Sequence, residues 1–286
     1  MMRLALRSLG VPLLGLWLGL VAGCAVEVPL SASFKPLAPA RVAEPLTPQA
    51  VQRQMLAPEG VLRVGVYAAS PTSLVRNPSL SQPVGLAYEL GHALAQRLDV
   101  PVQVREYPRV AEVIRALAAG EVDLTFTNAS AARARLVDFT SPLLRLDLGV
   151  LVPPGSPIQS FADLDRAGVP VGVSQGSSSQ AALSSRLQHP RLVPVDTLDT
   201  ARQWLRTQQI EAFTTNKGIL FELADQLPGF VVLPDRWGVE QLALAIPKGR
   251  DKAMPMLQQF ANDMVRSGQV QAMAQRAGLR GLSTQP

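Results

Sequence analysis

Cysteine and histidine are scarce in this chain of 286 residues. The single cysteine, Cys24, excludes an intrachain disulfide and any CxxC redox or metal motif. The two histidines are far apart: His92 lies at helical spacing among apolar residues, and His189 precedes a proline. They supply neither a metal site nor a nucleophile with a neighbouring base. We therefore expect no catalytic residues, no metal and no cofactor.

Concentrated positive charge is also missing, although the formal net charge is +5. The Lys and Arg residues are scattered, with no basic block and no basic stripe interleaved with aromatic residues, so nucleic-acid binding is not expected. Apolar residues make up 47% and charged residues 17%, which is a globular composition. The length suits one large domain or two of ordinary size.

The N-terminus has the pattern of a targeting segment. Arg3 and Arg7 precede an apolar run, Val11–Ala22, which is too short to span a bilayer comfortably. The run closes on Val-Ala-Gly-Cys, which resembles a bacterial lipobox, where the chain is cut before the cysteine. We expect residues 1–23 to be a lipoprotein signal peptide and Cys24 to be lipidated. The alternative is a plain signal peptide with an incidental cysteine, which would leave a soluble periplasmic protein.

The next segment, residues 24–59, is expected to be a tether. It contains six prolines and little periodicity, and the helical signal of Pro48–Leu56 is weak. Such a composition favours a semi-extended linker that carries a folded body away from an anchored end.

From residue 62 onward, strand-like runs alternate with helical spacing, which predicts an α/β fold with a mainly parallel sheet. The expected strands are Leu62–Val66, Val102–Val104, Val122–Phe126, Leu146–Val152 and Pro170–Val173, and the expected helices are Gly85–Leu98 and Val110–Leu117.

The chain also contains an internal repeat. Leu117–Asn128, LAAGEVDLTFTN, matches Leu205–Asn216, LRTQQIEAFTTN, and Val64–Ser73 matches Val171–Gln180 more loosely. We interpret this as two similar α/β lobes whose polar strand ends face one cleft, in preference to a single large sheet.

Val122–Pro142 contains the candidate anion-binding residues. After its strand come small polar residues and a short basic helix, which suit an anion because amide groups at a helix start and a guanidinium both bind carboxylates. An ordinary loop with a solvated arginine is the alternative. The polar residues concerned are Thr127, Asn128, Ser130 and Arg133.

The order of these segments resembles the bacterial extracellular solute-binding proteins of family 3, the amino-acid-binding subunits of ABC importers, over roughly residues 62–279. The resemblance is carried by Leu62–Gly65, Gly85–Leu90, Leu117–Asp123, Arg133, Val137–Pro142, Phe161–Leu164, Val171–Ser178 and Ala245–Gly249. It implies a type II periplasmic-binding fold, with two α/β lobes of mainly parallel sheets joined by two hinge strands. The first lobe would be residues 60–149 plus 245–286, and the second 150–244.

The resemblance also implies a ligand site. The family's carboxylate-binding arginine falls at Arg133, and its partner hydroxyl falls at Ser130 or Asn128, because this loop is two residues shorter than usual. Serines at the start of the helix after Gly176 can cap it and donate to an anion. The residues assigned to the ligand are Tyr67, Ser70, Thr127, Asn128, Ser130, Arg133, Ser174, Ser177, Ser178 and Asn216.

Three departures from the family bear on the ligand. Asn216 replaces the acid that holds an α-ammonium group, Tyr67 replaces a second acid, and Ser70 replaces an aromatic residue. The remaining donors, with Lys217 as a possible addition, favour a small anionic or carboxylated polar ligand. A displaced acid such as Glu89 or Asp147 could restore an ammonium site.

These observations predict a monomeric, lipid-anchored binding protein on the periplasmic side of a bacterial membrane, which feeds a ligand to an inner-membrane ABC permease. One alternative is a membrane-tethered sensor without a transport role. Gly85–Leu90 also resembles the solute-binding-like domain of a murein transglycosylase, although we expect no catalytic domain here. The other alternative function is a dehydratase on the same fold, with Glu89 or Glu240 as its acid.

Overall fold

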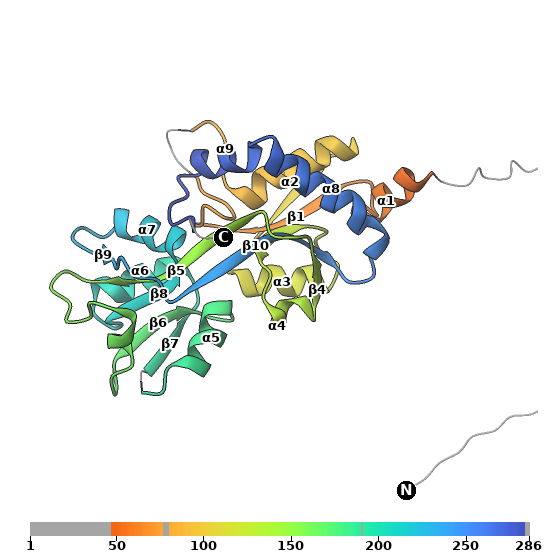
Figure 1. Ribbon diagram of the computed structural model, residues 1–286. Coiled ribbons are helices and arrows are strands. Elements are labelled where there is room, and N and C mark those ends of the chain that lie inside the picture. The colour runs from red at the N-terminus through yellow and green to blue at the C-terminus, as the bar shows by residue number, and fades with distance from the viewer. Residues whose placement is uncertain (1–46, 77–79, 190, 284–286) are drawn as a thin grey trace, which may run out of the picture. The chain divides into compact units, whose positions relative to one another are not determined.

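The N-terminal part of the described chain already belongs to the folded body. The computed structural model describes residues 47–76, 80–189 and 191–283 (Figure 1), so the predicted signal peptide and Cys24 lie outside the described residues. The predicted tether is wrong in one part, because Pro48–Leu56 forms helix α1, whose Leu56 is fully buried in the first lobe. This helix of nine residues is stabilised by packing, which local periodicity does not reveal. In the described part of the chain, no helix is long and apolar enough to cross a bilayer.

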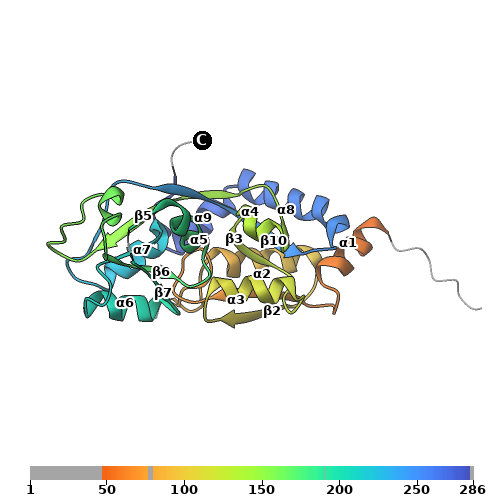
Figure 2. The ribbon, with the colours of Figure 1, turned by 90° about the horizontal axis from the view of Figure 1, so that it is seen from below.

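The first lobe has a parallel β1-β2 pair, and the bridge from Val64 to Leu124 connects β1 to the chain just before β3. The large core packs under α2, α8 and α9, while α3 covers the opposite face, which is turned to the viewer in Figure 2. The elements are β1 (Leu62–Tyr67), α2 (Leu86–Leu98), β2 (Val102–Tyr107), α3 (Val110–Ala118), β3 (Thr125–Asn128), α4 (Ala131–Ala134), β4 (Val137–Phe139), η2 (Asp251–Ala253), α8 (Met254–Arg266) and α9 (Gln269–Arg276).

The second lobe repeats this plan with β6 between β7 and β8, all parallel. Helix α5 packs on one face of these strands, where Leu183 is buried, and α6 and α7 pack on the other, around Phe213. The elements are η1 (Phe161–Leu164), β6 (Pro170–Ser174), α5 (Ser178–Arg186), β7 (Arg191–Val195), α6 (Leu198–Arg206), β8 (Ala212–Asn216), α7 (Lys217–Asp225) and β9 (Val231–Val232).

Two long antiparallel strands, β5 (Leu144–Val152) and β10 (Gly238–Pro247), connect the lobes (Figure 1). The strand order β3-β10-β5-β8-β6-β7 makes the hydrogen bonding continuous across the connection, whereas the apolar cores on its two sides are separate. The fold is therefore the predicted two-lobed one. Both predicted lobe boundaries, 149/150 and 244/245, fall inside these hinge strands.

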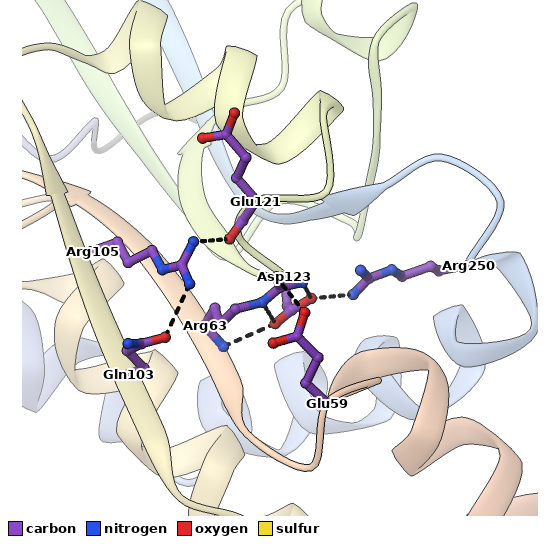
Figure 3. A network of polar contacts seen from close by, with 7 residues as sticks. All are labelled: Glu59, Arg63, Gln103, Arg105, Glu121, Asp123 and Arg250. Carbon is purple, nitrogen blue, oxygen red and sulfur yellow. Dashed lines mark hydrogen bonds and ion pairs between the residues drawn. The ribbon is translucent and has the colours of Figure 1, made fainter.

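A buried ion cluster holds the first lobe together at the start of its sheet (Figure 3). Asp123 is fully buried and accepts hydrogen bonds from Arg63 at 2.7 and 2.8 Å and from Arg250 at 2.8 Å. Burial alone would raise the pKa of Asp123, but the bonds from the two arginines outweigh it and the pKa lies below its usual value. The predicted strand Val122–Phe126 starts later than expected, at Thr125. The residues just before it, Asp123 and Leu124, donate their amides to the Arg63 carbonyl.

The chain after α9 leaves the first lobe and runs along the hinge. The Gly281 carbonyl accepts from the Asp147 amide at 2.9 Å, and the Ser283 amide donates to the Arg145 carbonyl at 3.0 Å. Between them, Leu282 bridges to β5. Arg280 pairs with Asp225 of α7, so this segment contacts both a hinge strand and the second lobe.

Candidate functional site

The two lobes enclose a cavity of about 40 Å³. It lies where β1 and β3 end in the first lobe and where β6 and β8 end in the second. Both Thr-Asn pairs of the repeat line it, namely Thr127 with Asn128 and Thr215 with Asn216. The repeat thus predicted correctly that corresponding strand ends of the two lobes meet at one cleft.

Arg133 is the main charged group on the first-lobe side. It follows β3 by one short loop, lies on α4, and is only 8% exposed. Its Nη1 donates to the Thr127 hydroxyl at 2.8 Å and to the Asn128 carbonyl at 3.4 Å. Burial lowers the pKa of Arg133, and the negative field of Glu240 opposes that shift. Arg133 forms no salt bridge with any residue that the structure describes.

Tyr67 and Thr72 complete this side of the cavity. The phenol of Tyr67 is protonated at neutral pH, as tyrosines ordinarily are, and can donate a hydrogen bond; burial raises its pKa further. Thr72 is buried and was not predicted from the sequence.

Two predicted residues of the first lobe do not line the cavity. Ser130 is the N-cap of α4, and its hydroxyl accepts from the Arg133 amide at 3.3 Å. Ser70 is fully buried and bonds to Tyr67 and Thr72. Both serines support neighbours of the cavity, and of the pair Ser130 and Asn128 only Asn128 reaches it.

On the second-lobe side, the cavity is lined by three serines that the sequence analysis assigned to the ligand, Ser174, Ser177 and Ser178. Ser174 ends β6, and Ser177 caps α5 by accepting from the Gln180 amide at 3.1 Å. The first turn of α5 therefore presents its amide groups next to this cap.

Asn216 and Glu240 form a polar pair in the cavity wall. The Asn216 Oδ1 accepts from the Ile219 amide at 3.1 Å and so caps α7, while its Nδ2 donates to Glu240 Oε2 at 3.1 Å. The other carboxylate oxygen of Glu240 accepts from the Ser178 hydroxyl at 2.7 Å. Glu240 lies on hinge strand β10 and is 6% exposed. Its position in the site was not predicted, except as the acid of the dehydratase alternative.

The displaced acids expected from the sequence lie elsewhere. Glu89 pairs with Arg276 at 2.5 Å, and Asp147 pairs with Arg236 at 3.1 Å, and neither lines the cavity. Lys217 also points away, because its ammonium donates to the Pro234 carbonyl at 2.8 Å. Across the described residues, no group of three His, Cys, Asp or Glu side chains is arranged to hold a metal ion.

Two contacts join the lobes beside the cavity. Arg109, at the start of α3, pairs with Asp196 of the second lobe at 3.0 Å. Nearby, a methyl group built on Gly176 would lie 2.6 Å from the Cβ of Ala111 in α3. The lobes are thus in close contact here, and neither contact was predicted.

The arrangement combines one buried cation, one buried carboxylate and several hydroxyl groups between two lobes. A profile of the bacterial extracellular solute-binding proteins, family 3, matches residues 62–279. The chain belongs to this family. Members of the family are binding proteins for small solutes, which agrees with a polar cavity between two lobes.

The sequence identity between this chain and individual similar proteins is low. The membrane-bound lytic murein transglycosylase F of Vibrio cholerae is 30% identical over 133 residues, which are 45% of this chain but only 21% of the transglycosylase. A probable histidine-binding protein of Neisseria gonorrhoeae is 22% identical over 65% of this chain and 71% of its own length. The crystal structure of the solute receptor for L-cysteine of Neisseria gonorrhoeae covers 81% of this chain and 93% of its own, at 23% identity and a TM-score of 0.69. These likenesses agree with the two-lobed fold.

Proposed function

We propose that this protein captures a small carboxylated polar solute, an amino acid or a related organic anion, between its lobes. The observation that carries the proposal is Arg133, a buried guanidinium in the cavity with no carboxylate bonded to it in the described part of the chain. A buried charge without a partner is costly, and a ligand carboxylate would supply that partner with two parallel hydrogen bonds. Ser174, Ser177 and the phenol of Tyr67 would then supply further donors.

The biological setting is also part of the proposal. Solved structures similar to this chain include a substrate-binding protein of an amino-acid ABC transporter from Streptococcus pneumoniae, bound to L-arginine. We propose that this chain is a monomer on the periplasmic side of a bacterial membrane, anchored by a lipid at Cys24, and that it feeds an ABC permease. Replacing Cys24 with Ala should move the protein from the membrane fraction to the soluble fraction of lysed cells.

The direct test is the variant Arg133→Ala. Ligands stabilise the state that binds them, so the melting temperature of the full chain should rise in the presence of a bound amino acid or carboxylate. Arg133→Ala should abolish that rise, whereas the melting temperature without ligand should change little because the described bonds of the wild-type guanidinium go to one hydroxyl and one carbonyl, and none goes to a carboxylate. A panel of neutral, acidic and basic amino acids with mono- and dicarboxylates covers the proposed class. Equal shifts in wild type and variant would remove Arg133 from the site.

A second candidate is a membrane-tethered sensor that binds the same class of ligand without transport. The similarity to part of a murein transglycosylase favours it, because a related segment there belongs to a much longer protein named as a cell-wall enzyme. Uptake of the radiolabelled ligand in cells that lack the gene separates the two candidates. Reduced uptake supports the importer, and unchanged uptake supports the sensor.

We further propose that the site binds its ligand without converting it. The dehydratase alternative retains only Glu240, because Glu89 lies outside the cavity and pairs with Arg276. A ligand incubated with the protein should be recovered unchanged by mass spectrometry, and time-dependent loss of one water molecule would indicate the enzyme.

A further inference from the structure

Glu240 is a buried carboxylate without a cation bonded to it. Its two oxygens each accept one hydrogen bond, from the Ser178 hydroxyl and from the Asn216 amide group. Neither donor is charged, and Glu240 forms no salt bridge with a residue in the described ranges. Two neutral hydrogen bonds orient a carboxylate but leave its charge and about two lone-pair sites available.

Arg133 is the matching case of opposite sign in the same cavity. Both side chains line the cavity, each is less than one-tenth exposed, and no salt bridge joins them. A ligand that neutralises only Arg133 would bring a second negative charge near Glu240. A ligand with a carboxylate and an ammonium group satisfies both buried charges at once.

Asn216 is a weaker acceptor for that ammonium group than Glu240, because its amide oxygen carries no net charge and already accepts one hydrogen bond. Its only acceptor atom, Oδ1, bonds to the Ile219 amide at the start of α7, and its Nδ2 points toward Glu240 as a donor. The buried acid of this wall therefore lies on hinge strand β10, and Asn216 at the end of β8 is one of the two residues that hold it.

We infer that Glu240 is the residue that selects ligands with an ammonium group, and that Asn216 and Ser178 are the positioning residues that hold its carboxylate. The inference rests on the proposed function and deepens it, because it separates α-amino acids from plain carboxylates. Two donors from the second lobe hold an acid on a hinge strand, opposite an arginine of the first lobe.

The volume of the cavity limits the size of the ligand. A cavity must offer about 10–15 Å³ in the same measure to hold one water, so 40 Å³ suits the zwitterionic core with a short side chain. L-Alanine, L-serine and L-cysteine are of this size, and propanoate, 3-hydroxypropanoate and 3-mercaptopropanoate are their counterparts without the ammonium group.

The test is calorimetric titration of the full chain and of Glu240→Gln with these three pairs. Wild type should bind the amino acid of at least one pair more tightly than its counterpart. In Glu240→Gln, affinity for that amino acid should fall about ten- to hundredfold, the usual range for a hydrogen bond to a charged group. Affinity for the counterpart should stay the same or rise, because the repulsion between two carboxylates is gone.

Two further variants make the result specific. Asp147→Asn removes a carboxylate that is ion-paired outside the cavity, and it should leave the preference for the amino acid unchanged. Ser178→Ala removes one of the two bonds to Glu240. It should lower the affinity for the amino acid by about three- to tenfold and leave the affinity for the counterpart unchanged. If Glu240→Gln does not fold, as judged by its melting curve, Ser178→Ala decides.

The outcomes distinguish this inference from the proposed function. Equal wild-type affinity for both members of every pair would overturn the role of Glu240 and leave the role of Arg133 intact. A preference that survives in Glu240→Gln would do the same. Absence of binding by every amino acid and carboxylate, in wild type as in Arg133→Ala, would overturn the proposed function and the inference together.

Discussion

At the scale of single residues, two buried carboxylates of this protein have opposite surroundings. Asp123 is bonded to two arginines, so its charge is compensated within the chain. Among the described residues, Glu240 is bonded to a hydroxyl and an amide group, neither of them charged. Burial alone therefore does not identify a functional acid, and the charge of its partners does.

The Asp123 cluster gives a prediction for stability against pH. Because the folded-state pKa of Asp123 lies below its unfolded value, its contribution is complete above about pH 4 and is lost as the pH falls through the folded pKa. Asp123→Asn should lower the free energy of unfolding by about 3–5 kcal/mol at pH 7, since the buried Arg63 and the partly buried Arg250 lose their bonds to a charged carboxylate. Its stability should also fall less than that of wild type below pH 4. Urea titrations at pH 7 and in acid measure both effects.

A matched control comes from the same loop. Glu121 is exposed, and only its backbone carbonyl bonds to Arg105 (Figure 3). Glu121→Gln should change the unfolding free energy by less than about 0.5 kcal/mol. A similar loss in both variants would mean that the Asp123 cluster is not the source.

From the sequence, Arg133 was assigned to the ligand and Glu240 only to the dehydratase alternative, although a signal for the burial of Glu240 was present. In β10, Glu240, Leu242 and Leu244 are spaced by two residues, so the two-residue period of a strand puts all three on one face. A carboxylate in register with buried leucines indicates a buried acid. Its partners could not be predicted, because Ser178 and Asn216 are distant in sequence and meet it only through tertiary packing.

At the scale of elements, the repeat explains why the strand ends of the two lobes share the cavity. Asn128 ends β3 and accepts from the Gln241 amide at 3.1 Å, while Asn216 ends β8 and donates to the adjacent Glu240. Corresponding asparagines of the two lobes thus bond to neighbouring residues of one hinge strand. Period and repeat predicted β1, β2, β5 and β6 and the polar ends of β3 and β8. The strands β4, β7 and β9 were not among those expected, and α1, which depends on long-range packing, was missed.

The cap of α7 gives a prediction for this pair of elements. In Asn216→Asp the carboxylate can still cap the helix, but it replaces a donor next to Glu240 by a second negative charge. Two carboxylates in contact raise the pKa of the pair, so the folded variant should bind an extra proton and lose stability as the pH rises. We expect a loss of about 1–3 kcal/mol at pH 7.5 and less at pH 5, measured by urea unfolding.

Asn216→Ser is the control for that variant, because serine caps a helix without adding charge. Its loss of stability should be the same at pH 5 and pH 7.5. Stronger pH dependence in Asn216→Ser than in Asn216→Asp would contradict the predicted contact of two carboxylates.

At the scale of the whole lobes, the contact between the lobes beside the cavity depends more on shape than on charge. Asp196 is 70% exposed, so its salt bridge with Arg109 should contribute only about 0.2–1 kcal/mol. The close approach of Gly176 to Ala111 leaves no room for a side chain.

Gly176→Ala should therefore hinder closure. The added methyl group would collide with Ala111, and we expect ligand affinity to fall about tenfold or more, which corresponds to about 1.4 kcal/mol. Gly155→Ala is the matched control, because both glycines have a φ near +70° but Gly155 has no neighbour within 4 Å of an added Cβ. Both variants should lose similar stability, and only Gly176→Ala should lose affinity in calorimetry. Unchanged affinity in Gly176→Ala would mean that ligand is held with the lobes further apart.

The segment after α9 has a consequence for anyone who attaches a reporter to this protein. Because Arg280 and Gly281 bind the second lobe and a hinge strand, a dye on Ser283 would experience a new environment each time the hinge bends. A dye on Gln54 of α1 is carried by the first lobe alone and would serve as the silent reference. A fluorescent readout of ligand capture can thus be built at a position well away from the cavity, without altering any residue that lines it.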